Sequence, residues 1–143
     1  MSYSVDATIL LYASDASSPH HARAAEFLAR CASDGEPCCL TWGTVMGYLR
    51  MSTHPGIFGA PLSPEEAMRN IDGLLALPHV RVVPEGEGFW GIYRALVDGL
   101  AVRGNLVPDA HMAALLRQHD VRVLYTNDTD FRKFDFLDVR NPL

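Results

Sequence analysis

VRVLYTNDTDF, residues 121–131, joins an apolar run to a turn that holds two aspartates and an asparagine. The run VRVLY is rich in β-branched residues and predicts a buried strand. The turn that follows it has two explanations. Asn and Asp stabilise turns by bonding to their own backbone, and carboxylate oxygens are also the ligands that Mg²⁺ and Mn²⁺ accept. Because the turn alone does not decide between them, the positions of the other acids relative to the strands are needed.

Outward from this segment, predicted strands alternate with predicted helices. Strands are expected at residues 3–6, 37–42, 80–83 and 121–125, and helices at 7–13, 20–31, 44–51, 64–76 and 89–102. Asp34-Gly35 is expected to end the helical segment that contains residues 20–31. A sixth helix, within residues 106–120, is expected to start at Pro108, because proline favours the first helical position. Ser63 and Glu66 form a capping-box pattern before the fourth helix. This alternation predicts an α/β fold with a mainly parallel sheet covered on both faces.

Length and composition narrow the class of protein. With 143 residues, 48% of them hydrophobic, we expect a single domain spanning residues 1–143. The formal net charge of -5 argues against broad wrapping of nucleic acid and leaves room for local phosphate contacts only. The chain has an odd number of cysteines, Cys31, Cys38 and Cys39, and they form no C-x-x-C motif. Neither a disulfide framework nor a zinc site is therefore expected. With no signal peptide and no apolar run long enough for a membrane, we expect a cytoplasmic protein.

Four aspartates fall where parallel strands end or the following helices begin. Asp6 ends the first strand, Asp109 lies in the first turn of the sixth helix, and Asp128 and Asp130 follow the strand at 121–125. With right-handed crossovers, these positions share one edge of a parallel sheet, the edge at which such folds bind ligands. Carboxylates brought together there repel one another unless a cation neutralises them. We therefore expect a site for a hard divalent ion, Mg²⁺ or Mn²⁺.

Each of these acids also has an ordinary structural explanation. Asp6 is suited to cap the first helix, and Asp109 complements a helix dipole. Asp128 and Asp130 are common residues of a solvated turn. Their joint placement at one edge, rather than any one of them, favours the metal site.

Four stretches, in order over nearly the whole chain, resemble the PIN-domain ribonucleases. They are VDATILLY, WGTVMGYLR, GNLVPDAHMAALL and TNDTDFRKF, and they are most similar to the VapC toxins of bacterial VapBC toxin-antitoxin systems. The resemblance implies an α/β/α sandwich with Mg²⁺- or Mn²⁺-dependent endoribonuclease activity, a VapB-like antitoxin as partner and a homodimer. It places Asp6, Asp109 and Asp128 as metal-binding catalytic acids, with Asp130 as an adjunct catalytic acid and Thr126 and Asn127 as supporting polar groups.

One position departs from the family pattern. The family usually carries a glutamate three residues before an arginine on the helix after the second strand, and here Gly47 precedes Arg50. The departure leaves open whether one or two metal ions bind. A replacement acid could come from a loop, and the sequence does not select among Glu65, Glu66, Glu85 and Glu87.

Side chains that could contact RNA lie near the proposed edge. Arg50, Arg132 and Lys133 are candidates for phosphate contacts, with a solvated charged surface as the alternative. Trp42 and Tyr48 could stack on a base, with burial in the core as the alternative. His111 is excluded from the metal shell because positions two apart face different sides of a helix.

The resemblance leaves two functions open. The first is an endoribonuclease toxin that cleaves RNA phosphodiester bonds and is neutralised by its antitoxin. The alternative is a PIN-like module, catalytically weakened by the missing glutamate, that binds antitoxin or RNA without cleaving. A phosphoacceptor receiver domain fits poorly, because it requires paired acids after the first strand and Asp6 stands alone there.

Overall fold

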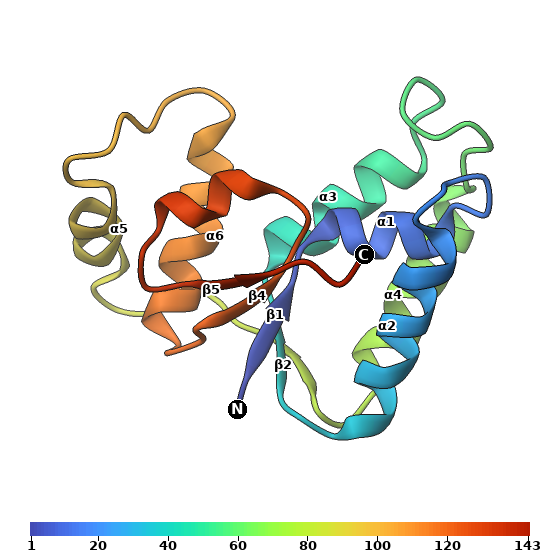
Figure 1. Cartoon of the computed structure of the whole chain (residues 1–143), viewed down its shortest axis with the longest axis horizontal. Helices are drawn as coiled ribbons and strands as arrows, with labels where there is room; N and C mark the ends of the chain where they lie inside the picture. The colour runs from blue at the N-terminus through green and yellow to red at the C-terminus, as the bar shows by residue number, and fades with distance from the viewer.

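The computed structural model describes all 143 residues and is built around one sheet of five parallel strands in the order β3-β2-β1-β4-β5 (Figure 1). The strands are β1 (Tyr3–Val5), β2 (Cys38–Leu40), β3 (Val80–Val82), β4 (Val123–Tyr125) and β5 (Asp138–Arg140). The helices are α1 (Ala7–Ser14), α2 (His21–Asp34), α3 (Trp42–Ser52), α4 (Pro64–Leu75), α5 (Phe89–Val97) and α6 (Leu106–Gln118), with a 3₁₀ helix, η1, at Thr129–Lys133. The predicted α/β fold is confirmed.

Alternate strand residues supply two separate cores, one on each face of the sheet. Cys38 and Leu40 of β2 pack in one cluster with residues of α1, α2, α3 and α4. Cys39, between them, belongs to a second cluster with α6 and the segment after β4. Figure 1 shows α2 and α4 on one side of the sheet and α5 and α6 on the other. The sheet is therefore covered on both faces, as in an α/β/α sandwich.

The strand β5 was not predicted from the sequence. Its residues Asp138 and Arg140 are exposed and pair with each other at 2.7 Å, so the segment lacks the apolar pattern of a buried strand. It pairs in parallel with β4 along its whole length. Short, charged strands are typical of sheet edges, where exposed backbone groups would otherwise recruit other chains.

Three predicted helix boundaries were wrong. Thr41 caps α3 by accepting a hydrogen bond from the backbone N–H of Thr44 at 3.1 Å, so Trp42 belongs to the helix and not to the strand. The helix α5 ends at Val97 instead of residue 102, because Gly99 takes up a left-handed conformation (φ 79°). The helix α6 starts at Leu106, two residues before Pro108.

The capping box before α4 is confirmed in both directions, with Ser63 accepting from the Glu66 backbone at 3.1 Å and Glu66 accepting from that of Ser63 at 3.4 Å. The helix ends at Leu75. None of the helices is both long and apolar enough to span a bilayer. All three cysteines are free thiols.

Replacement of Gly73 by alanine is expected to stabilise the protein. Gly73 is an exposed residue within α4, and a Cβ atom added there would meet no other atom within 4 Å. Alanine loses less backbone entropy than glycine in a helix, which corresponds to about 1 kcal/mol. We expect Gly73→Ala to raise the free energy of unfolding by about that amount in urea titrations. An unchanged midpoint would mean that α4 is not a regular helix at this position.

Candidate metal centre

The sheet topology brings the acids that follow β1 and β4 together. These strands are neighbours, with Val5 opposite Tyr125, so Asp6 and Thr126 leave the sheet side by side. The backbone N–H of Asp6 donates to the carbonyl of Tyr125 at 3.0 Å. Asp109 reaches the same edge from the first turn of α6. The predicted convergence of chain segments more than a hundred residues apart is therefore observed.

Asp6 is held by hydrogen bonds from three donors. Its Oδ1 accepts from the backbone N–H of Ala7 at 2.7 Å, which makes it the N-cap of α1. Its Oδ2 accepts from the hydroxyl of Thr126 at 2.8 Å and from that of Thr8 at 3.2 Å. The carboxylate of Asp6 is thus fixed in one orientation at the end of β1.

Thr126 connects Asp6 to the acidic turn. Its hydroxyl donates to Asp6 and accepts from the backbone N–H of Asp128 at 3.0 Å. The side chain is buried, with 1% of its surface exposed. Asn127 donates from its side-chain amide to the hydroxyl of Tyr12 at 3.3 Å, which anchors the turn to α1. Both residues were predicted as supporting groups, and these contacts are the kind that such a role requires.

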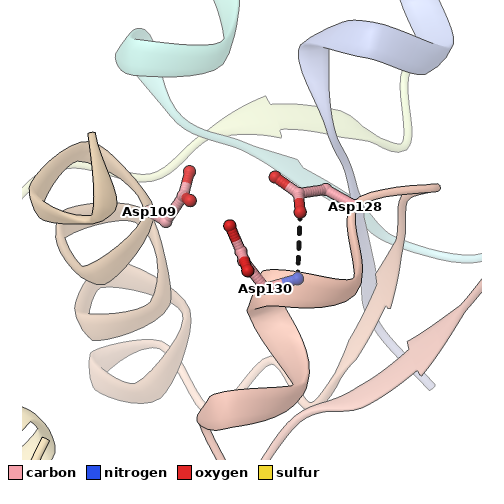
Figure 2. A group of neighbouring side chains, drawn as sticks. All are labelled: Asp109, Asp128 and Asp130. Atoms are coloured by element: carbon pink, nitrogen blue, oxygen red, sulfur yellow. Dashed lines mark hydrogen bonds between the residues drawn. The ribbon is translucent and has the colours of Figure 1, made fainter.

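Asp109, Asp128 and Asp130 each place a carboxylate oxygen within 4.8 Å of those of the other two. Figure 2 shows Asp109 extending from α6 toward Asp128 and Asp130, across the gap between α6 and η1. Asp128 caps η1 by accepting from the backbone N–H of Asp130 at 2.9 Å. The turn TNDTDF is thus the start of a 3₁₀ helix, which aims both of its carboxylates toward Asp109. We call Asp109, Asp128 and Asp130 the acid triad.

Burial and mutual repulsion make this edge unfavourable for negative charge. Burial raises the pKa of Asp6, and the hydrogen bonds from Thr126, Ala7 and Thr8 oppose that rise. The pKa of Asp109 is raised to about 6, first by burial and then by the charges of Asp128, Asp6 and Asp130. A bound dication would relieve this repulsion, and a set of carboxylate oxygens without nitrogen or sulfur suits a hard ion such as Mg²⁺ or Mn²⁺. The residues present therefore fit the predicted ion.

The structure separates the three predicted phosphate-binding residues. Lys133 is next to the triad, with its ammonium 3.6 Å from a carboxylate oxygen of Asp130. Arg132 is exposed on η1 and borders a small hollow lined by Thr126 and Asp128. Arg50 is exposed in the last turn of α3, about 12 Å along the helix axis from its N-terminal end. Of the three, Lys133 has the most direct electrostatic contact with the acids.

Two candidate replacements for the missing glutamate are engaged elsewhere. Glu66 completes the capping box of α4, and Glu85 contacts His111 at 2.6 Å. Gly47 lies on the face of α3 that turns toward α1, where an added Cβ would lie 3.7 Å from that of Ala7. A side chain at residue 47 would therefore begin beside the residue that follows Asp6. This chain has no carboxylate there.

The structure adds detail for two residues. Asp130 was assigned an adjunct role, and its carboxylate lies within 4.8 Å of those of Asp109 and Asp128, whereas Asp6 is engaged with Thr126, Thr8 and its own helix. The two-residue spacing of Asp128 and Asp130, read as a capped 3₁₀ turn, could have indicated this. Tyr48 is not available for stacking, because it is 1% exposed and its hydroxyl contacts Ser14 and Asn70.

Comparison with known proteins identifies the same family as the sequence motifs do. Residues 3–137 match the PIN domain family. The chain is 43% identical over 142 residues to "Ribonuclease VapC48" of Mycobacterium tuberculosis, covering 99% of this chain and 98% of the relative. It is 34% identical to "Ribonuclease VapC43" of the same organism, covering 97% of this chain and 94% of the relative.

Solved structures share the fold at low sequence identity. VapC20 of Mycobacterium tuberculosis, described as a sarcin-ricin loop cleaving toxin, matches with a TM-score of 0.70 and 17% identity, over 96% of this chain and 98% of the other. VapBC2 from Rickettsia felis, bound to a DNA fragment from its promoter, matches with a TM-score of 0.70 and 16% identity. The match covers 99% of this chain and 98% of the other. At these identities the likeness concerns the fold alone.

Proposed function

Because this chain belongs to the PIN domain family, in its VapC group, we propose that it is an endoribonuclease toxin that requires Mg²⁺ or Mn²⁺ and is neutralised by a VapB-type antitoxin. The observation that carries the proposal is the acid triad, whose three carboxylates gather within 4.8 Å at the carboxyl edge of the sheet. The relatives named as ribonucleases match nearly the full length of the chain. RNA is therefore the proposed substrate.

Each acid has a distinct part in this proposal. Asp109, Asp128 and Asp130, with Asp6 behind them, would hold one divalent ion, which when bound lowers the pKa of water and stabilises charge on a phosphate. Asp6 orients Thr126, and Thr126 in turn positions the backbone of Asp128. Lys133 offsets part of the negative charge at Asp130. Arg132 and Arg50 remain candidates for contacts to phosphates farther along the RNA.

The proposed antitoxin site is an apolar groove between α2 and α4. It has a volume of ≈330 Å³, and its lining includes Leu28, Ala32, Ile71 and Leu74. Phe27, which precedes Leu28 on α2, is buried in the core and does not line the groove. An amphipathic helix of the antitoxin would place its apolar face in such a groove. A homodimer and a cytoplasmic location belong to the same proposal, and a sizing column tests the first.

The experiment that tests the proposal is a cleavage assay on total bacterial RNA with Mg²⁺, Mn²⁺ or EDTA. We expect discrete fragments with either ion and none with EDTA, and their loss in Asp109→Asn and Asp128→Asn. Asp72→Asn, at an exposed acid of α4, is the matched control and should cleave like the wild type. If RNA binds to the wild-type protein but stays intact under all conditions, the non-cleaving binding module becomes the correct description.

Binding of the ion is expected to stabilise the folded protein. A ligand that binds only the native state at a hundred times its dissociation constant adds about 2.7 kcal/mol to the free energy of unfolding. We expect Mn²⁺ titrated into the wild-type protein to raise the melting temperature, and the rise should continue with the logarithm of the free Mn²⁺ concentration once the site is saturated. The shift should disappear in Asp128→Asn and persist in Asp72→Asn. An equal shift in all three proteins would show that the ion binds somewhere other than the triad.

A further inference from the structure

An open groove with a volume of ≈730 Å³ lies between α5, the last turn of α6 and the segment that follows η1. Ile92, Ala95 and Leu96 of α5 form an apolar wall on one side. Arg117 of α6 and Lys133 at the end of η1 line the other side. Protein sites for small ligands usually have volumes of about 300–1,000 Å³, so the groove is large enough to hold part of a substrate.

Lys133 places this groove next to the acid triad. It lines the groove, and its ammonium lies 3.6 Å from a carboxylate oxygen of Asp130. The helix η1 packs against α6, and Figure 2 shows both elements leading away from the triad in the same direction. Arg117 follows Asp109 on α6 by about two turns, which corresponds to a rise of about 12 Å. The groove therefore begins beside the triad and extends along α6.

The guanidinium of Arg117 is oriented by an aromatic ring and has no anionic partner. It lies over the ring of Phe136, 5.1 Å from the centroid. Asp98 and Asp135 also line the groove, yet none of the ion pairs in the structure includes Arg117. A stacked guanidinium keeps its in-plane N–H donors free, and these donors match the oxygens of a phosphate. Arg117 is therefore arranged to receive an anion from solvent.

The two sides of the groove match the two parts of a nucleotide. Lys133 and Arg117 suit phosphates, and the apolar wall of α5 suits bases, which an unpaired strand can turn away from its backbone. Gly88 and Gly91 leave the α5 wall open, because a Cβ atom added at either position would meet no other atom within 4 Å. Since Lys133 is already paired with Asp130, Arg117 is the cation of the groove that is free to bind a phosphate.

We propose that this groove holds the single-stranded RNA on one side of the scissile phosphate, with Arg117 bound to a phosphate of that segment. The inference rests on the proposed ribonuclease function and adds to it a substrate-binding residue outside the acid triad. The strand runs from the triad past Lys133 to Arg117.

The salt dependence of RNA binding tests the contact at Arg117. Binding of a labelled single-stranded RNA of mixed sequence is measured by fluorescence anisotropy in the cleavage-blocked Asp109→Asn background. Each phosphate contact on a single strand contributes about -0.7 to the slope of the logarithm of the association constant against that of the salt concentration. We expect Arg117→Ala to weaken binding about tenfold at low salt and to reduce the magnitude of the slope by about 0.7. Arg69→Ala removes an exposed arginine from α4, on the other side of the sheet, and should bind RNA like its parent.

A second variant tests the groove without changing its charge. The side chain of Gly91→Gln would extend into the open groove, and glutamine favours a helix more than glycine does, so the fold should be retained. We expect this variant to bind RNA more weakly than its parent. Gly73→Gln, at an exposed glycine of α4 with equal space around it, is the matched control and should bind RNA normally. The melting temperature of each variant verifies that it is folded.

Two outcomes would overturn the inference. If the wild type cleaves RNA while Arg117→Ala and Gly91→Gln keep their RNA affinity and salt slope, the ribonuclease function stands and the groove does not hold the strand. If either variant elutes differently from a sizing column and its RNA affinity is unchanged, the groove contacts a second copy of the chain instead. Failure of the wild type to cleave any RNA would remove the ribonuclease function, and the same titrations would still decide whether RNA occupies the groove.

Discussion

Asp109→Asn is expected to lower RNA cleavage by more than about a hundredfold while making the folded protein more stable. Substitutions of residues that merely orient a metal ligand reduce affinity or activity by about 10- to 100-fold, so loss of a ligand should exceed that range. Asparagine keeps the size of the side chain and one oxygen but removes the charge. Both effects follow from one cause, the concentration of negative charge at the triad.

The gain in stability should depend on pH in a defined direction. The pKa of Asp109 is raised in the folded state from 3.8 to about 6, so the folded protein holds this proton more tightly than the unfolded chain does. Its contribution to stability is fully present below about pH 4 and is lost as the pH rises through about 6. Above that pH, removal of the charge should add about 1 kcal/mol, a value reduced for solvent screening of this half-buried group.

Thermal unfolding in EDTA from pH 4 to pH 8 measures this effect. Asp109→Asn should melt together with the wild type at the acidic end and about 3 °C higher at the alkaline end. Asp72→Asn should follow the wild type throughout. An Asp109→Asn protein that is less stable at pH 8 would mean that this carboxylate has a structural partner, contrary to a site built for a cation.

Asp6→Ala is expected to have the opposite effect on stability. It removes the cap of α1 and leaves the hydroxyl of Thr126, which is 1% exposed, without its acceptor. Loss of a helix cap costs about 1 kcal/mol, and an unsatisfied buried hydroxyl costs about 1–3 kcal/mol. Relief of the buried charge offsets part of this sum. We expect a net loss of about 2 kcal/mol in the free energy of unfolding, measured by urea titration.

Asp6→Asn distinguishes the hydrogen bonds of Asp6 from its charge. Asparagine retains an acceptor for the backbone N–H of Ala7 and removes the charge, so its stability should lie close to that of the wild type. Its cleavage rate should nevertheless fall about a hundredfold, because the carboxylate and the position of Asp128 are both disturbed. Equal destabilisation by Asn and Ala would mean that the charge itself holds the N-terminus of α1.

The acidic turn illustrates how far sequence reasoning reaches. Parallel strands joined by right-handed crossovers have their carboxyl ends at one edge, so element order alone places Asp6, Asp109 and Asp128 at the same edge. That they meet there depends on β1 and β4 being neighbours in the sheet. The strand β5 could not be found in this way, because DVR is short and polar and becomes a strand only by pairing with β4. A pattern of hydrophobic residues reports which segments are buried and carries little information about exposed edges.

Which carboxylates face one another was decided by tertiary contacts. The sequence by itself determined the α/β class, the edge at which the acids meet and the oxygen-rich chemistry of the site, because these depend on residue type and on the order of strands and helices. Only the tertiary structure assigned Asp130 to the triad and tied Asp6 to Thr126, 120 residues away. It likewise buried Tyr48 and exposed Trp42. Side-chain direction depends on caps, on the η1 turn and on packing between distant segments, and a linear pattern specifies none of these.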